Sequence, residues 1–85
     1  MKTYTVTMTK DRTGSTYTST GTIPELVKYY GYTLECGQSW QHESGNSKIN
    51  RNPKGIKTLI KNLNNAVNNS AANGYAGETY NAVEV

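Results

Sequence analysis

The residues best suited to chemistry in this chain are its one cysteine and its one histidine, Cys36 and His42. A thiol beside an imidazole can act as a nucleophile–base pair. On one extended strand, however, six residues would hold the two side chains about 20 Å apart. A single Cys and a single His also supply too few ligands for a tetrahedral zinc site. We expect a small buried thiol and an ordinary histidine, and keep a Cys/His enzyme as the third functional hypothesis.

The other catalytic patterns in the chain are incomplete. Residues 36–40, Cys-Gly-Gln-Ser-Trp, are similar to the papain-type signature, but Ser39 stands at the nucleophile position and the chain is too short for the distant His and Asn of that family. Residues 55–58, Gly-Ile-Lys-Thr, lack the upstream glycine of a phosphate-binding loop. The acidic residues are scattered along the chain. We therefore expect a non-enzymatic protein without catalytic residues, metal or cofactor.

The positive charge of the chain is concentrated between residues 48 and 61. The formal net charge is only +3, yet residues 44–74 contain five cations and no acid. Lysines one helical turn apart can contact successive phosphates, and amides among them can bond phosphates or base edges. The alternative is an ordinary solvated helix face, although such faces usually carry both basic and acidic side chains. We predict a binding surface made of Lys48, Arg51, Lys54, Lys57, Lys61 and Asn65.

Aromatic side chains give a second binding signal. The chain has seven Tyr, one Trp and no Phe. Tyr and Trp are frequent at protein interfaces and as platforms on which bases stack. The alternative is that Tyr replaces Phe in the core, which we expect for Tyr30 but not for Tyr29. We add Tyr29, Tyr32 and Trp40 to the predicted binding residues.

Length and composition predict one domain over residues 1–85. The chain has a mass of 9.4 kDa, is 34% hydrophobic and has no long apolar run, so we expect no membrane span. Residues 1–10 lack the apolar centre of a signal peptide, and one cysteine cannot form an internal disulfide. These features predict a cytoplasmic protein.

The first half of the chain shows a hairpin followed by a short helix. In residues 3–9, apolar side chains alternate with threonines, which predicts a half-buried strand. Residues 15–20 are rich in Ser and Thr and predict an edge strand, whose exposed edge permits a dimer. Thr22 and Glu25 form a capping box that begins a helix over 23–30, and Gly31 is a natural stop.

The second half predicts further strands and one long helix. Alternation at Tyr32, Leu34 and Cys36 predicts a third strand over 32–36. Residues 40–43 either continue this strand past Gly37 or form a separate piece, and residues 44–47 form a turn. A short strand over 48–51 is an open alternative. Asn52 and Pro53 begin a helix over 53–71, where apolar residues recur with helical period and five asparagines weaken the second half. Asn73 and Gly74 end it. A last strand lies within 75–85, with Gly77 as a bulge.

These elements predict an α+β fold. We expect a mostly antiparallel sheet of four or five strands with one long and one short helix, in the order β-β-α-β-(β)-α-β. Two helices cannot cover both faces of so small a sheet, so a two-layer sandwich results.

Two segments, TIPELVKYYGYTLE at 22–35 and KINRNPK at 48–54, resemble small early-region proteins of phages that infect Gram-positive bacteria. The resemblance covers about half of the chain and implies a host-cytoplasm setting. The roles it implies are handling of nucleic acid or inhibition of a host protein, as in anti-CRISPR proteins. It assigns no role to individual residues. The basic charge disfavours a DNA mimic.

Two functional hypotheses follow beside the enzyme. The first is a phage-type protein that inhibits or redirects a host protein or nucleoprotein complex, for example a host-defence nuclease, through the basic helix face and exposed aromatics. The second is direct binding of DNA or RNA by the helix over 53–71. The sequence leaves the partner, the nucleotide preference and the oligomeric state open.

Overall fold

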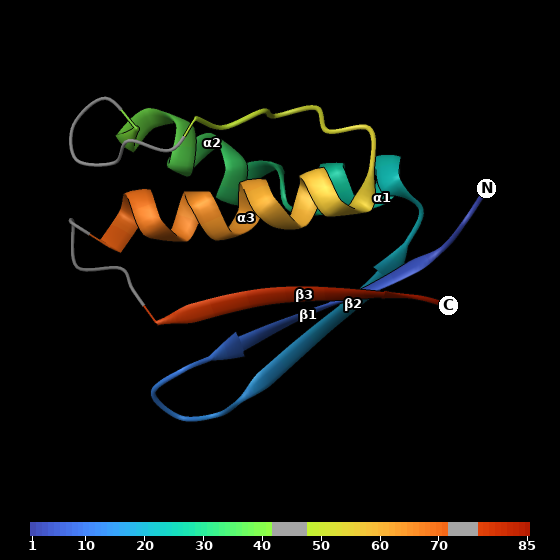
Figure 1. The fold of residues 1–85 in the computed structure, drawn as a ribbon, viewed down its shortest axis with the longest axis horizontal. Coiled ribbons are helices and arrows are strands. Elements are labelled where there is room, and N and C mark those ends of the chain that lie inside the picture. Colours follow the sequence, from blue (N-terminus) through green and yellow to red (C-terminus); the bar gives the residue numbers. More distant parts are fainter. Residues whose placement is uncertain (42–47, 72–76) are drawn as a thin grey trace.

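A computed structural model describes residues 1–41, 48–71 and 77–85. Its elements follow the order β1 (Tyr4–Lys10), β2 (Thr16–Gly21), α1 (Ile23–Tyr29), α2 (Gly31–Trp40), α3 (Ile56–Ala71) and β3 (Glu78–Glu84). The strands form one antiparallel sheet in the order β2-β1-β3, and the helices lie on one face of it (Figure 1). The predicted α+β class is correct. The predicted four or five strands with two helices are wrong, because the described residues form three strands and three helices.

The N-terminal hairpin forms as the alternation of residues predicts. Val6 is buried in the core, and Tyr4 and Met8 pack against its margin. The turn uses Gly14, whose φ of 75° favours glycine. Strand β2 lies at an edge of the sheet, as expected, and the threonines of β1 face away from the helices. The sheet therefore has one packed and one open face.

Helix α1 begins at the predicted capping box. The Glu25 carboxylate accepts hydrogen bonds from the Thr22 N–H and the Thr22 hydroxyl, each 2.9 Å long. These bonds lower the pKa of Glu25, since they favour its charged form. The helix ends at Tyr29, one residue short of the predicted 23–30. Hydrogen bonds between neighbouring residues thus set where this helix begins.

The predicted strand over 32–36 is wrong, because these residues belong to α2. The buried positions are Tyr30, Leu34 and Gly37, whose spacing of four and three is helical. Of the three alternating residues, Leu34 is buried whereas Tyr32 is 79% exposed. The predicted continuation of the strand begins at Trp40, the last residue of α2, while 42–47 lie outside the described residues.

The predicted strand over 48–51 is also wrong. We call residues 48–55 the crossing segment, because they run without helix or strand over the helical layer, on the side away from the sheet (Figure 1). Ile49 and Pro53 are buried and hold the segment down. Helix α3 therefore begins at Ile56 rather than at Pro53, and the Leu59 N–H donates to the Gly55 carbonyl at 3.0 Å. The expected stop at 73–74 lies outside the described residues.

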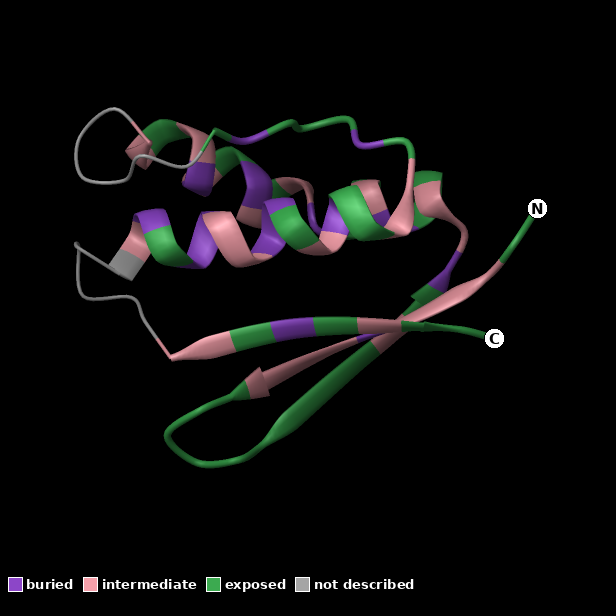
Figure 2. Ribbon diagram, in the orientation of Figure 1, coloured by how far each residue is buried: buried purple, intermediate pink, exposed green. Residues whose placement is uncertain are grey.

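The core lies between α3 and its two neighbours, α2 and the sheet (Figure 2). Leu59 and Leu63 are fully buried among residues that include Val6 and Tyr80. On the α2 side, a Cβ added to Gly37 would lie 2.4 Å from the Ala66 Cβ. The two helices approach so closely because neither carries a larger side chain at this point.

Three asparagines of α3 bond to the backbone of three different elements. The Asn62 Oδ1 accepts from the Asn50 N–H at 2.6 Å, and the Asn69 Nδ2 donates to the Gly37 carbonyl at 3.0 Å. Asn64 bonds both backbone groups of Tyr80, accepting from its N–H at 2.8 Å and donating to its carbonyl at 3.2 Å. Asparagine has a low helix propensity and weakens α3 locally, but these three side chains hold the neighbouring segments against the helix through hydrogen bonds.

Strand β3 turns Tyr80 towards the helices and leaves Val83 exposed, as an alternating strand must. Gly77 precedes the strand with a φ of 89°, and its carbonyl accepts from the Asp11 N–H at 2.6 Å. Pairing with β1 runs without a break from Glu78 to Glu84, so Gly77 lies outside the ladder and is not a bulge within it.

Replacing Asn64 with alanine leaves the Tyr80 N–H and carbonyl without their partner at the edge of β3. We expect a loss of about 1–3 kcal/mol in the free energy of unfolding, measured by urea denaturation. The control is Asn68→Ala, which changes an exposed asparagine of the same helix. Equal stability of the two variants would show that the Asn64 bonds contribute nothing.

Replacing Gly37 with alanine forces α2 and α3 apart, because the new methyl group would overlap Ala66. We expect a loss of about 1–3 kcal/mol in thermal or urea unfolding. Adding Ala66→Gly should not restore the stability, because the new Cβ would still lie 2.6 Å from the backbone Cα of residue 66. Gly31→Ala is the control, since nothing lies within 4 Å of a Cβ at Gly31 in the same helix. That variant should equal or exceed the stability of the parent by up to about 1 kcal/mol. A Gly37→Ala protein as stable as the Gly31→Ala protein would contradict the close approach.

Candidate functional site

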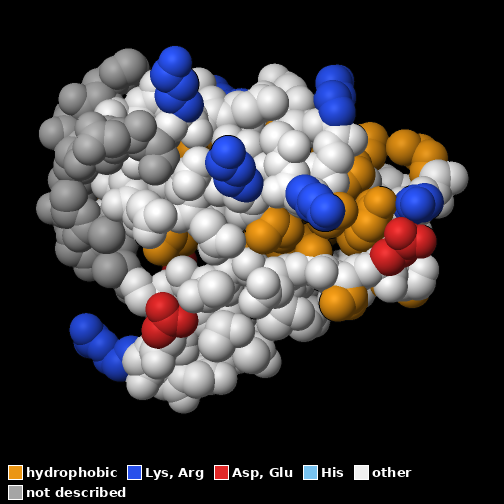
Figure 3. Space-filling model, in the orientation of Figure 1, with side chains coloured by type: hydrophobic (Ala, Val, Ile, Leu, Met, Phe, Trp, Pro, Cys, Tyr) orange, Lys and Arg blue, Asp and Glu red, His pale blue; other side chains and the backbone are white. Residues whose placement is uncertain are grey.

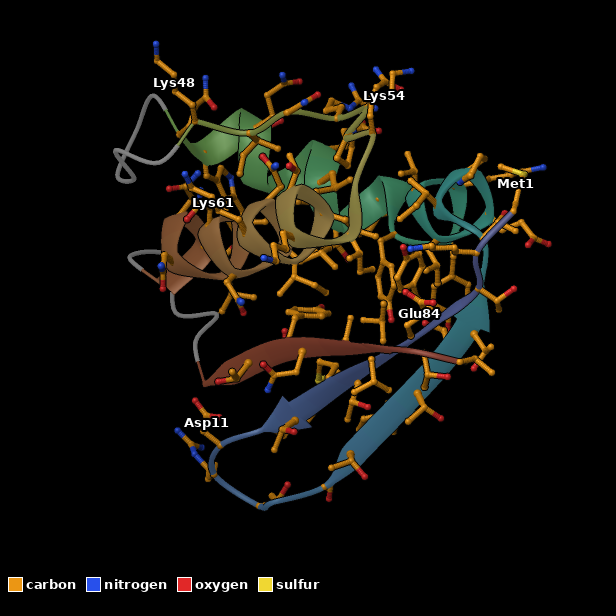
Figure 4. The ribbon with its side chains drawn as sticks, turned by 45° about the vertical axis from the view of Figure 1, so that its right-hand side comes forward. Met1, Asp11, Lys48, Lys54, Lys61 and Glu84 are labelled. Carbon is orange, nitrogen blue, oxygen red and sulfur yellow. The ribbon has the colours of Figure 1, made fainter. Side chains whose placement is uncertain are left out.

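The five predicted cations all lie on the helical layer and are exposed. We call them the basic surface: Lys48, Arg51 and Lys54 on the crossing segment, and Lys57 and Lys61 on α3. Figure 3 shows basic side chains distributed over this layer, whereas the acidic side chains on the same face lie lower, at the sheet and the chain ends. In Figure 4 the labelled Lys48, Lys54 and Lys61 stand on the helical side, and Asp11 and Glu84 stand on the sheet. The helical layer therefore carries most of the cations, although Lys2 and Lys10 lie on the sheet layer and Glu35 lies on α2.

The position of the basic surface depends on the anchoring of the crossing segment. Ile49 is buried beside Lys48, and the Asn50 N–H is held by Asn62 of α3. Pro53 is buried beside Lys54. Because these anchors alternate with the cations, Lys48 and Lys54 are held outward above the helix that carries Lys57 and Lys61. Cations from two separate segments thereby share one side of the molecule.

Only one cation of the basic surface is paired within the described residues. The Arg51 Nη2 lies 3.4 Å from the Glu35 Oε2 of α2, and both side chains are exposed, so the pair contributes little stability. The four lysines form no ion pair within ranges 1–41, 48–71 and 77–85. Their positive field is therefore available to a partner.

A shallow groove of about 350 Å³ runs between α3 and β3 beside two of these lysines. Ile56, Ile60 and Ala82 give it an apolar lining, and Lys57 and Lys61 stand beside them. Asn64 also lines the groove, but its amide already bonds the backbone of Tyr80. The groove thus offers cations beside an apolar surface.

The amides near the basic surface are largely engaged within the protein. Asn50 accepts from the Asn52 N–H at 2.9 Å, and Asn62 holds the Asn50 N–H. The predicted binding residue Asn65 is half-buried, one turn after Lys61 on α3. The lysines rather than the amides therefore dominate the chemistry of this surface.

The structure does not bring the predicted aromatics to the basic surface. Tyr32 and Trp40 line a second pocket of about 350 Å³, which we call the aromatic pocket and which also contains Thr33, Cys36, Ala66, Val67, Ser70 and Glu78. Lys57 and Ala66 are nine residues apart on α3, about two and a half turns, so they lie on opposite sides of the helix. Tyr29 is 69% exposed and lines neither pocket.

Sequence reasoning missed the aromatic pocket because its walls come from three elements. Tyr32, Cys36 and Trp40 recur every four residues, the spacing of one helix face, but they were assigned to strands. Glu78 carried a usable signal, since it lies two residues from Tyr80 on a strand and must face the same side. Nothing in the sequence brings Glu78 to Trp40.

Tyr30 and Tyr80 form the aromatic part of the core. Tyr30 is 8% exposed, as predicted, and its hydroxyl hydrogen-bonds the Ser19 hydroxyl at 2.5 Å. The two rings meet edge to face with centroids 5.7 Å apart. Burial raises the pKa of both phenols; for Tyr80 it reaches about 12, with smaller increases from Glu78 and Tyr30 and a decrease from a hydrogen bond with Thr33.

The Cys/His hypothesis involves one residue that the structure describes, Cys36, and one that it does not, His42. Cys36 is half-buried on α2 rather than fully buried. Within the part of the chain that the structure describes, no three His, Cys, Asp or Glu side chains gather as metal ligands.

Comparisons with known proteins give no relative. No protein-family model matches the chain, and no similar protein was found among the curated proteins or the solved structures. The resemblance to phage proteins therefore stays a prediction. None of the helices in the described ranges is both long enough and apolar enough to cross a membrane.

Tyr80 should make the folded protein sensitive to alkali. An unfolded tyrosine ionises near pH 10, whereas the pKa of folded Tyr80 is about 12. Unfolding then releases a proton, so stability is fully present below about pH 10 and falls as the pH rises towards about 12. Urea denaturation across this range should show a shallower loss for Tyr80→Phe than for the parent. Tyr17→Phe, on the exposed hairpin, should leave the pH dependence of the free energy of unfolding unchanged. The same pH dependence in all three proteins would refute the role of Tyr80.

Proposed function

We propose that this protein binds nucleic acid directly, through the phosphate backbone and without catalysis. The observation that carries the proposal is a group of four exposed lysines that have no ion pair among the described residues. Lys48, Lys54 and Lys61 stand on the helical side in Figure 4, and Lys57 lines the same groove as Lys61. Phosphate contacts by lysine do not read the base sequence, so we expect binding of many sequences.

The spacing of the lysines supports contact with a strand of phosphates. Lys57 and Lys61 are one helical turn apart, about 6 Å along the axis of α3. Lys54 lies just before the helix, and Lys48 is held at the other end of the crossing segment. A nucleic acid strand can therefore follow the helical layer and release its counterions at several points. The groove beside Lys57 and Lys61 offers apolar contact to sugars or bases of the same strand.

The same geometry favours nucleic acid over a host protein as the partner of this surface. Lysine is depleted at the desolvated centres of protein interfaces, whereas it is common at phosphate contacts. Binding of a host protein through a joint basic and aromatic surface would need both groups on one face, and Tyr32 and Trp40 lie with Ala66 on the other side of α3. Inhibition of a host protein or nucleoprotein complex remains the alternative hypothesis.

The proposal predicts strongly salt-dependent binding. Fluorescence anisotropy with labelled single-stranded and duplex oligonucleotides should give an affinity that falls linearly with the logarithm of the salt concentration. The double variant Lys57→Gln and Lys61→Gln should lower the magnitude of the slope by about 2 on a duplex and weaken binding of unrelated sequences equally.

The matched control is the double variant Lys2→Gln and Lys10→Gln, which removes the same charge from the sheet layer. It should keep the slope of the parent. An equal decrease of the salt-dependence slope in both double variants would indicate that the net charge of the protein, and not the basic surface, governs binding. No binding to DNA or RNA at low salt, together with nuclease-resistant capture of a host protein, would replace this proposal with the alternative.

A further inference from the structure

We propose that the aromatic pocket receives an arginine side chain of a protein partner. This inference goes beyond nucleic-acid binding, because the pocket and the basic surface share no residue. Arginine is a cation. The pocket would therefore select a positively charged group, whereas the lysines attract a negatively charged partner.

The walls of the pocket suit a flat cation. Tyr32, Cys36 and Trp40 form a line along α2, one helical turn between neighbours, and place an aromatic side chain towards each end. Ala66, Val67 and Ser70 of α3 form the facing wall, with small side chains that leave space open. A volume of about 350 Å³ lies at the small end of the range for binding pockets and fits one long side chain. Guanidinium groups stack on Trp and Tyr faces by cation–π attraction.

The charge of the pocket favours the same ligand. Among the described residues that line it, Glu78 is the one that carries a charge, and it is half-buried. Lys10 faces Glu78 across the strand pair, but its Nζ lies 5.9 Å from the centroid of the Tyr17 ring, and no ion pair joins it to Glu78. The carboxylate can accept two parallel N–H bonds from a guanidinium, the strong bidentate geometry. A phosphate would meet repulsion at this point.

Trp40 provides a direct test, because it is the one tryptophan of the chain. The probe is N-acetyl-arginine amide, titrated against the intrinsic fluorescence of the full chain without nucleic acid. N-acetyl-citrulline amide is the neutral control of nearly equal shape. We expect a saturable change with the arginine probe and binding about tenfold weaker with the citrulline probe. Equal binding of the two probes, or no saturable response to arginine, would overturn the proposal.

Two pairs of variants separate recognition from folding. Glu78→Gln should weaken arginine binding about tenfold, whereas Glu84→Gln, on the same strand and beside Lys2, should leave it unchanged. Tyr32→Ala should weaken arginine binding about threefold. Tyr29→Ala changes a tyrosine that is also largely exposed but lies outside the pocket, and it should have no effect.

Tyr32 is so exposed that its removal should not affect folding, which urea denaturation checks. Unchanged affinity in both Glu78→Gln and Tyr32→Ala would overturn the proposal. So would a nucleoside that binds the pocket more tightly than the arginine probe, since that result would assign the aromatic walls to base stacking.

Discussion

Three asparagine side chains of α3 tie the neighbouring segments to this helix. Their amides bond backbone N–H and C=O groups of the crossing segment, α2 and β3. Asn62 bonds the crossing segment, Asn64 bonds Tyr80 at the edge of β3, and Asn69 bonds the Gly37 carbonyl near the end of α2. The Gly37 carbonyl is available to Asn69 because the Gln41 N–H donates to the Gln38 carbonyl instead. Buried backbone groups without partners are costly, so each amide fixes one neighbour at a defined height along α3. The helix thus serves as the common support of an edge strand, a second helix and an irregular segment.

The close contact of Gly37 with Ala66 then decides which sides of α3 remain open. With α2 against one side of the helix and the sheet against another, Lys57 and Lys61 are left facing solvent. The crossing segment adds its own cations to the same side, while the small residues of α3 leave the aromatic pocket between α2 and β3. One helix therefore separates a cationic surface from an aromatic pocket with a carboxylate, and a small chain gains two surfaces of opposite chemistry.

The elements that sequence reasoning predicted well are those decided by neighbouring residues. The alternation around Val6 and the Thr22–Glu25 cap need only local contacts, and β1, β2 and α1 were predicted to within a residue or two. The error at 32–36 arose because Gly37 was not counted as a packing position, although its lack of a side chain is what allows α2 to meet Ala66. Pro53 favours a helix start, yet its burial in the crossing segment moves the start of α3 to Ile56. Tertiary packing overrode local preference at both places.

From the sequence alone came the concentration of cations between residues 48 and 61, the hairpin, the capped helix and the apolar stripe of the long helix. Tertiary structure alone decided which side chains share a surface. Lys48 and Lys61 lie on one side because Ile49 and Asn62 anchor the crossing segment to α3, and Glu78 reaches the pocket of Trp40 through the pairing of β3 with β1. The physical reason is range: propensity and capping act within a few residues, whereas a binding surface is formed by packing between segments far apart in the chain.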